Sequence, residues 1–153
     1  MRNMKRLIIY TVTLLFIFSF FVFADGPMKD KDQEDSLLSF LEGFYEVVGK
    51  YPEGGDTYSG TMTLIRKGNE LQITRNIKGK KSTGSAKIIT ATADNIPVLH
   101  ADFMDGKQKL QATYIISTDL DNYARLTGKV YFIGRETKSP GLEALFIHHT
   151  SSK

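Results

Sequence analysis

Neither cysteine nor tryptophan occurs among the 153 residues of this sequence. Without cysteine the chain forms no disulfide bond, so its stability must come from a packed core. The same absence excludes cysteine nucleophiles, thiolate metal sites and the lipid-modified cysteine of a bacterial lipoprotein. A single domain of this size can bury roughly two thirds of its unfolded surface, which is sufficient for one closed core.

Several catalytic motifs are also missing. There is no phosphate-binding loop, no dinucleotide-binding glycine pattern and no Gly-x-Ser-x-Gly turn of a serine hydrolase. Gly84-Ser85 lies within an expected strand and has no matched base. A glycosidase-like carboxylate pair would have to come from Glu46, Asp102 or Glu143, and their expected facings do not support it. We therefore expect a protein that is not an enzyme, with an uncharacterised barrel enzyme as the remaining alternative.

The three histidines give little support for a metal site or another cofactor. They are His100, His148 and His149, and Asp102 is a carboxylate close to the first of them. Adjacent residues of a strand point to opposite faces, so His148 and His149 do not both reach one interior site. The interpretation is therefore that the histidines lie on the surface or at a barrel end, and no cofactor is expected.

The N-terminus has the plan of a secretory signal peptide. Arg2, Lys5 and Arg6 precede an almost wholly apolar run at 7–23, and Ala24 is followed by polar residues. We expect cleavage after Ala24 and a periplasmic or secreted product, with only a transient membrane contact. The alternative is an uncleaved anchor, although a membrane span usually needs about 20 apolar residues.

Removing residues 1–24 changes the charge balance. The full chain has 20 Lys and Arg against 17 Asp and Glu, and the first 24 residues contain three basic residues and no acidic one. The mature chain would therefore be close to neutral. Nucleic-acid binding needs a clustered basic face. The local cluster of Lys78, Lys80, Lys81 and Lys87 surrounds a glycine-containing turn and is interpreted as solvated, so no nucleic-acid partner is expected.

Alternation of apolar and polar residues dominates the rest of the chain, and 109–134 shows it most clearly. Leu110, Ala112 and Tyr114 alternate with polar residues, and the pattern resumes after a polar turn at 119–122. Such alternation is typical of antiparallel strands with one face in the core. The expected strands are 43–50, 58–66, 70–78, 83–92, 96–104, two within 109–134, and 143–150.

These eight strands follow one another through short turns, and none of the connections is long enough for a parallel crossover. A sandwich and a closed barrel are the two solutions. Eight strands is the number at which a barrel holds packed side chains or one small ligand. Gly60, Gly84 and Gly128 fall on the expected inward faces, where barrel corners require glycine. We therefore predict an all-β fold, an eight-stranded antiparallel up-and-down barrel.

The sequence predicts three regions along the chain. Residues 1–24 are the signal peptide, 25–42 a charged leader with a short helix, and 43–150 the barrel. The leader at 27–35 is dense in charge and is expected to be mobile. The helix is expected at 36–41, capped by Asp35 or Ser36 and plugging one end of the barrel.

The mature chain resembles small exported bacterial proteins of the calycin group, the lipocalin-like and avidin-like barrels. The residues that carry the resemblance are Gly43-Phe-Tyr45-Glu-Val47-Val-Gly49, Tyr58-Ser-Gly60, Gly84, Tyr114-Ile-Ile, Leu126-Thr-Gly128 and Gly141-Leu-Glu143. The resemblance implies an eight-stranded barrel with a cavity open at one end. Lipocalins carry Gly-x-Trp where this chain has Gly43-Phe44-Tyr45, and the lack of tryptophan argues against a biotin site.

Aromatic residues supply the candidate ligand site. Six residues are expected to face inward and to line a cavity: Tyr45, Tyr58, Arg75, Phe103, Tyr114 and Phe132. The first functional hypothesis is an exported barrel that binds a lipophilic or amphiphilic small molecule in a mostly apolar cavity. The alternative is that these side chains fill the barrel, and that an envelope protein-interaction module acts through rim loops 52–57 and 135–141. The sequence does not indicate the oligomeric state.

Arg75 shares its expected face with Leu71, Ile73 and Ile77. A buried arginine must be paired or reach water, because its isolated burial is very costly. One interpretation places it at the barrel mouth or beside an inward carboxylate. The other has it bind the acidic head of an amphiphile, with Tyr58 or Tyr114 as an added donor.

Overall fold

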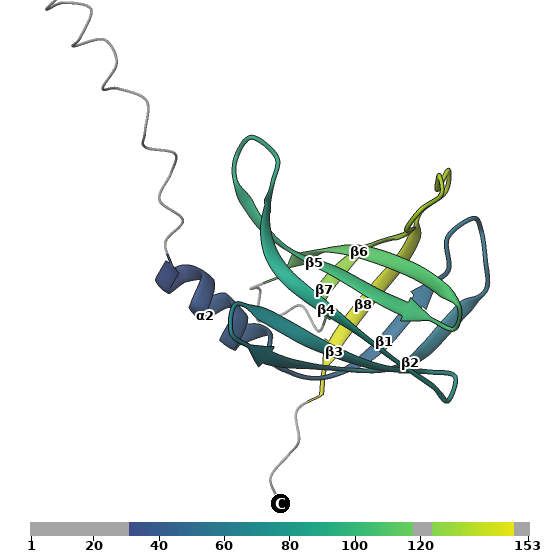
Figure 1. Ribbon diagram of the computed structural model, residues 1–153, viewed down its shortest axis with the longest axis horizontal. Helices are drawn as coiled ribbons and strands as arrows, with labels where there is room; N and C mark the ends of the chain where they lie inside the picture. Colours follow the sequence, from purple (N-terminus) through teal and green to yellow (C-terminus); the bar gives the residue numbers. More distant parts are fainter. Residues whose placement is uncertain (1–30, 118–123, 149–153) are drawn as a thin grey trace, which may run out of the picture. The chain divides into compact units, whose positions relative to one another are not determined.

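A computed structural model describes residues 31–117 and 124–148, and within them the chain forms a closed eight-stranded barrel preceded by one helix (Figure 1). Each strand pairs antiparallel with the next, so the predicted up-and-down barrel is confirmed. The elements are α2 (Lys31–Leu41), β1 (Gly43–Lys50), β2 (Thr57–Lys67), β3 (Glu70–Ile77), β4 (Lys80–Ala91), β5 (Ile96–Asp105), β6 (Gln108–Ile116), β7 (Ala124–Phe132) and β8 (Gly141–Ile147).

The barrel closes where β1 pairs with β8. Their antiparallel register runs from Tyr45 opposite Ile147 to Lys50 opposite Leu142. Closure leaves no sheet edge with unpaired backbone groups, which removes the usual route to strand-by-strand aggregation. It also places the first and last strands of the domain side by side.

The alternation seen in the sequence becomes the division between core and surface. In β3 every second residue is buried, and the buried set is Leu71, Ile73, Arg75 and Ile77. The predicted inward faces of β1, β2, β5 and β6 are confirmed in the same way, with Tyr45, Tyr58, Phe103 and Tyr114 among the core residues. Strand pattern therefore predicted most of the core.

Strand β7 differs in one respect. Val130 is fully buried, whereas Phe132, which was expected to face inward and line the cavity, is only half-buried. Phe132 is the last residue of β7 and lies at the end of the barrel. Its ring packs against the core, and the Arg135 guanidinium carbon lies 3.4 Å from the ring centroid.

The three inward glycines mark close approaches between strands, as predicted. A Cβ at Gly60, Gly84 or Gly128 would overlap a backbone carbonyl oxygen of the neighbouring strand, that of Asn76, Asp102 or Thr113 respectively. Only a residue without a side chain permits strands to approach so closely at a barrel bend.

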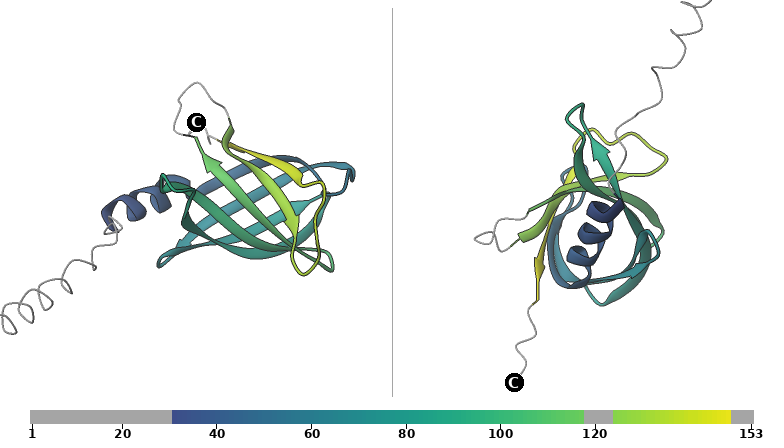
Figure 2. Two further views of the ribbon diagram at one scale, coloured as in Figure 1. Left: turned by 90° about the horizontal axis from the view of Figure 1, so that it is seen from above. Right: turned by 90° about the vertical axis from the view of Figure 1, so that its left-hand side faces the viewer.

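Helix α2 closes one end of the barrel (Figure 2). Leu38 and Leu41 are completely buried in the barrel core, and the Tyr45 hydroxyl donates a hydrogen bond of 2.9 Å to the Leu41 carbonyl. The plug predicted from 36–41 is thus present, but the helix begins earlier, at Lys31. Asp32 and Glu34 in its first turn favour this extension, because negative charge stabilises a helix N-terminus.

The rim of the barrel holds the early part of the helix in place. The Arg66 guanidinium forms an ion pair of 2.6 Å with the Asp35 carboxylate and a hydrogen bond of 3.3 Å to the Ser39 hydroxyl. The expected mobile leader at 27–35 therefore ends in ordered helix from Lys31 onward. No helix in the described part of the chain is long and apolar enough to cross a membrane.

Other boundaries differ by a few residues. β4 begins at Lys80 instead of residue 83, and β8 covers Gly141–Ile147 instead of 143–150. His149 lies outside the described residues, as do the expected turn at 119–122 and the expected cleavage point at Ala24. Gly68, in the short turn between β2 and β3, has φ +63°, a backbone conformation that favours glycine.

Candidate functional site

Five of the six candidate cavity residues lie in the barrel interior. Tyr45, Tyr58, Arg75, Phe103 and Tyr114 are each at least 96 % removed from solvent, since the largest exposed fraction among them is the 4 % of Tyr58. Phe132 lies at the end of the barrel. Tyr45 points to the helix plug, whereas Tyr58, Arg75 and Tyr114 meet at one carboxylate.

That carboxylate belongs to Glu143 of β8. Arg75 donates two hydrogen bonds to it, from Nη1 to Oε1 at 2.9 Å and from Nη2 to Oε2 at 2.7 Å. The two residues are 2 % and 3 % exposed. The geometry is the two-pronged pairing of guanidinium with carboxylate, the strongest form of ion pair available to arginine.

The two tyrosines complete the site. Tyr114 donates its hydroxyl proton to Glu143 Oε1 at 2.5 Å, and Tyr58 donates to Glu143 Oε2. Each of the two carboxylate oxygens therefore accepts one hydrogen bond from Arg75 and one from a tyrosine. The Phe103 ring lies under the guanidinium, with its centroid 4.0 Å from the Arg75 Cζ atom. Arg75 Nε has no hydrogen-bond partner among the described residues, and this ring contact offsets part of that cost.

Glycine provides the space that the tyrosines occupy. Glu143 is paired in register with Gly49 of β1 on one side and with Gly128 of β7 on the other. A Cβ at Gly49 would overlap the Tyr58 ring, and a Cβ at Gly128 would lie 2.8 Å from Cδ1 of Tyr114. The two register neighbours of the buried carboxylate thus make room for the rings that donate to it.

Burial and charge shift the pKa values of this cluster. Burial is the largest single effect on the pKa of Arg75 and lowers it, but Glu143 acting together with Tyr114 and Tyr58 raises the pKa above its usual value. Burial, followed by the charge of Glu143, raises the pKa of Tyr114 and that of Tyr58 well above the usual range. Tyr51, whose ring is tilted against that of Tyr58 with the centroids 4.4 Å apart, has its pKa raised to about 12, mainly by burial and then by its hydrogen bond to Asp105.

This arrangement joins strands across the barrel and occupies both oxygens of the Glu143 carboxylate. β2, β3, β6 and β8 each contribute one side chain, so four separate strands are joined through one carboxylate. Both Glu143 oxygens are already saturated with donors and shielded from water, so neither is placed to accept a proton from a substrate. The interpretation of Arg75 as paired with an inward carboxylate therefore agrees with the structure.

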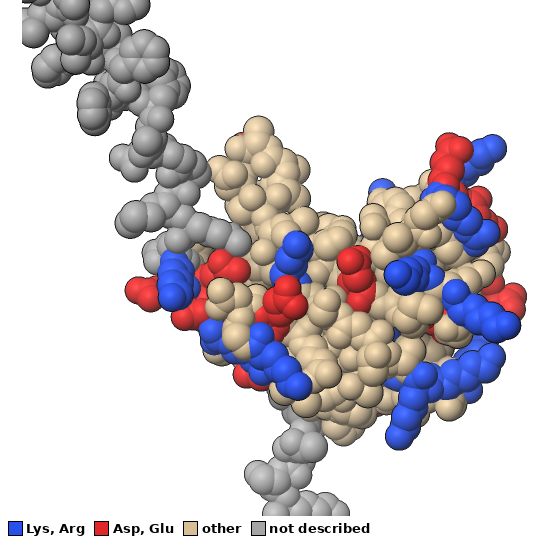
Figure 3. Space-filling view, viewed as in Figure 1, with Lys and Arg blue, Asp and Glu red and all other residues tan. Residues whose placement is uncertain are grey.

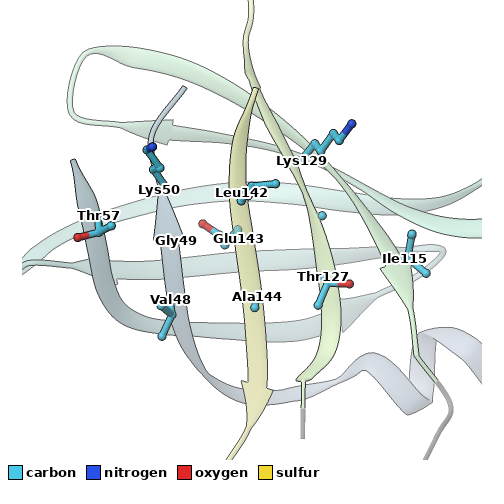
Figure 4. Close-up of a pocket in the computed structure, with 11 residues that line it drawn as sticks. Val48, Gly49, Lys50, Thr57, Ile115, Thr127, Lys129, Leu142, Glu143 and Ala144 are labelled. Atoms are coloured by element: carbon cyan, nitrogen blue, oxygen red, sulfur yellow. The ribbon is translucent and has the colours of Figure 1, made fainter. Parts of the chain in front are cut away.

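A hollow lies on the outside of the barrel. An open groove of about 560 Å³ runs over the outer wall formed by β6, β7, β8 and β1 (Figure 4). Exposed apolar side chains line it, namely Val48, Ile115 and Leu142, which are 54 %, 63 % and 58 % exposed. Its floor is formed by the small side chain of Ala144 and by the backbone at Gly49 and Gly128.

The strand register arranges this lining in two rows. One row runs Thr57, Lys50, Leu142 and Lys129 across β2, β1, β8 and β7. The next row runs Val48, Ala144, Thr127 and Ile115 across β1, β8, β7 and β6. Two lysines thus flank Leu142 in the first row, and the second row is mostly apolar (Figure 4).

Neither Glu143 as the central carboxylate nor this groove was found from the sequence. The reason is that β8 is apolar on both faces: Leu145 points inward while Leu142 and Ala144 point outward. Alternation then does not decide the facing of Glu143. The double-sided pattern was itself a signal, because a strand that is apolar on both faces is typical of one covered on both sides.

Histidine and acidic residues elsewhere form no cluster of metal ligands in the described part of the chain. His100 Nε2 lies 3.6 Å from Asp102 on the outer wall, and His148 Nδ1 lies 3.7 Å from Glu46. The face shown in Figure 3 carries Lys and Arg mainly over the end away from α2, with Asp and Glu among them.

Comparison with known proteins supports the fold and nothing narrower. No protein-family profile and no curated protein matches the chain. Among solved structures it is similar to a redesigned β-barrel, with a TM-score of 0.51 and 20 % sequence identity over 73 % of this chain and 95 % of that one. At this identity the likeness concerns architecture: the chain is an eight-stranded antiparallel β-barrel.

Proposed function

We propose that this protein is an exported, non-catalytic barrel that binds a lipophilic or amphiphilic small molecule in the groove on its outer wall. The observation that carries the proposal is the exposure of Val48, Ile115 and Leu142 around the small side chain of Ala144. Clustered exposed apolar side chains usually mark a binding surface. A volume of about 560 Å³ is within the range of ligand sites.

The interior is less suited to a ligand than the outer groove. Arg75 and Glu143 already satisfy each other there, and helix α2 fills one end with Leu38 and Leu41. A ligand would have to displace tightly packed side chains or separate a buried ion pair, and both are costly. The binding hypothesis from the sequence is therefore kept, with its site moved from the cavity to the wall.

A protein-interaction module is the second candidate, and the rim loops favour it. Glu53 Oε1 accepts hydrogen bonds from the backbone amides of Lys138 and Ser139 at 2.6 Å and 3.2 Å. The Glu53 amide donates to the Ser139 carbonyl at 2.7 Å. The loops within 51–56 and 133–140 are thus joined into one surface, which suits recognition of another protein.

Binding of the neutral dye Nile red, followed by fluorescence, tests the groove. Ile115→Asp places a charge on the apolar wall and should weaken binding at least about tenfold, since burying an isoleucine is worth roughly 1.5–3 kcal/mol. Ile65→Asp is the matched control, because Ile65 is 51 % exposed on β2 outside the groove. Equal binding by both variants and the wild type would contradict the proposal.

Extraction of the purified protein and mass spectrometry then identify any lipophile that co-purifies. Size-exclusion chromatography of the same variants tests whether a second copy of the chain occupies the groove. A wild-type dimer that Ile115→Asp converts to a monomer, with no dye binding in either form, would assign the groove to a second copy of the chain and overturn the proposal. Glu53→Ala should leave dye binding unchanged and disturb only the rim.

A further inference from the structure

We propose that the groove binds a single-chain anionic amphiphile, with its carboxylate or phosphate head between Lys50 and Lys129 and its alkyl chain over the apolar row. This inference rests on the proposed function and specifies the chemical class of the ligand. It follows from the order of the two rows, because the charged row lies beside the apolar row along the same three strands.

The two lysines are placed to share one head group. Each is the register neighbour of Leu142, one on β1 and the other on β7. Two strand spacings separate their Cα atoms, which is about 10 Å. Flexible four-carbon stems let both ammonium groups turn to one anion above Leu142. In Figure 4 the two side chains lie on either side of Leu142 at the same end of the groove.

The charge of the lining is positive. Its ionisable residues are Lys50, Lys129 and Glu143. The carboxylate of Glu143 points into the barrel and is neutralised by Arg75. Neither lysine forms an ion pair with an acidic residue of the described chain, so both are available for an external anion. Thr57, the register neighbour of Lys50, adds an exposed hydroxyl donor at the edge of this site.

The second row has the shape for one alkyl chain. Ala144 lies low between Val48 on one neighbouring strand and Thr127 on the other, with Ile115 beyond. The next outward residue of β1 is Glu46, which has His148 beside it at 3.7 Å. The groove thus carries positive charge at one end and is apolar along its middle, which matches an anionic amphiphile and not a cationic one.

Titration with dodecanoate and with its methyl ester, both below micelle formation, is the test. The wild type should bind the acid about tenfold more tightly than the ester, with about threefold from each lysine, as expected for exposed ion pairs. The preference should shrink as salt rises from about 0.01 M to about 1 M, because the Debye length falls from roughly 30 Å to roughly 3 Å.

Lys50→Met and Lys129→Met isolate the charge, because methionine keeps an apolar stem of similar length. The double variant should bind acid and ester equally. The matched control is Lys81→Met with Lys87→Met, which removes the same charge from the outer face of β4. That control should retain the preference of the wild type for the acid.

The outcomes separate the inference from the proposed function. If neither acid nor ester binds, the groove is not a lipophile site and both ideas fail. If both bind, Ile115→Asp abolishes both and the acid is not preferred, the head-group inference alone is overturned. An acid preference that persists in the Lys50→Met, Lys129→Met variant overturns it as well. Binding to phosphatidylglycerol vesicles without binding of monomeric dodecanoate would assign the surface to a membrane and also overturn it.

Discussion

Arg75 of β3 and Glu143 of β8 stand 68 residues apart in the chain and face each other inside the barrel through two hydrogen bonds. Their strands are not neighbours in the sheet, so the pair spans the interior. It is the polar centre of an otherwise apolar core, and its two tyrosine donors leave both carboxylate oxygens satisfied. Removing either partner would leave the other as an uncompensated buried charge, which is costly.

A double-mutant cycle should show that Arg75 and Glu143 are energetically coupled. Arg75→Met leaves the buried Glu143 carboxylate without its counter-charge and should lower the free energy of unfolding by about 3–5 kcal/mol. Glu143→Leu should cost a similar amount, because it leaves the guanidinium unpaired. The variant with both changes should be far less destabilised than the sum. Denaturant unfolding measures all three, and additive costs would show that the two residues are not coupled.

Tyrosine ionisation should make the barrel unstable in alkali. Unfolded tyrosine ionises near pH 10, whereas the folded pKa values of Tyr58 and Tyr114 lie well above this. The folded state then holds more protons than the unfolded state above about pH 10, so the free energy of unfolding falls as pH rises from there. Below about pH 10 these two tyrosines do not change the free energy of unfolding with pH.

The check is unfolding at a series of pH values, with tyrosinate absorbance followed in parallel. Replacing Tyr58 and Tyr114 by Phe should flatten the decline above about pH 10, at a cost of roughly 1.5–3 kcal/mol at neutral pH for each lost hydrogen bond to a charged group. Tyr131→Phe on the outer face of β7 is the control. An unchanged slope in the double Phe variant would refute the link.

Gly128→Ala should be strongly destabilising although it adds one methyl group. Its Cβ would overlap the Thr113 carbonyl and lie 2.8 Å from the Tyr114 ring, so β6 and β7 would have to separate. Gly106→Asn is the control: the space around Gly106 is open and its φ is +60°, which asparagine tolerates. Similar melting temperatures for both variants would argue against the close approach.

Shortening a buried side chain of helix α2 should show whether the helix is part of the barrel core. Leu41→Ala should cost about 2–5 kcal/mol, because Leu41 is completely buried. Leu142→Ala is the same chemical change at a residue that is 58 % exposed, and it should cost about 0.5 kcal/mol or less. If the two variants unfold at the same denaturant concentration, α2 does not contribute to the barrel core.

Local sequence was sufficient for the strands and most of their facings. Strand β3 alternates so regularly that Arg75 could be placed inside together with Ile73, and Gly128 could be placed on an inner face. The reason is geometric, since a strand repeats every two residues and each residue's side follows from its neighbours. The number of strands and the short turns then favoured an up-and-down barrel.

Tertiary structure decided the partners of those residues. Glu143 lies on a strand that is apolar on both faces, so its inward orientation and its pairing with Arg75 depend on contacts between β3 and β8 across the core. The groove depends on closure itself. Lys50 and Lys129 flank Leu142 because β1 pairs with β8, the last strand of the domain. Alternation acts over a few residues, whereas the closing of a barrel joins residues from its two ends, and that juxtaposition is set by the packing of the whole sheet.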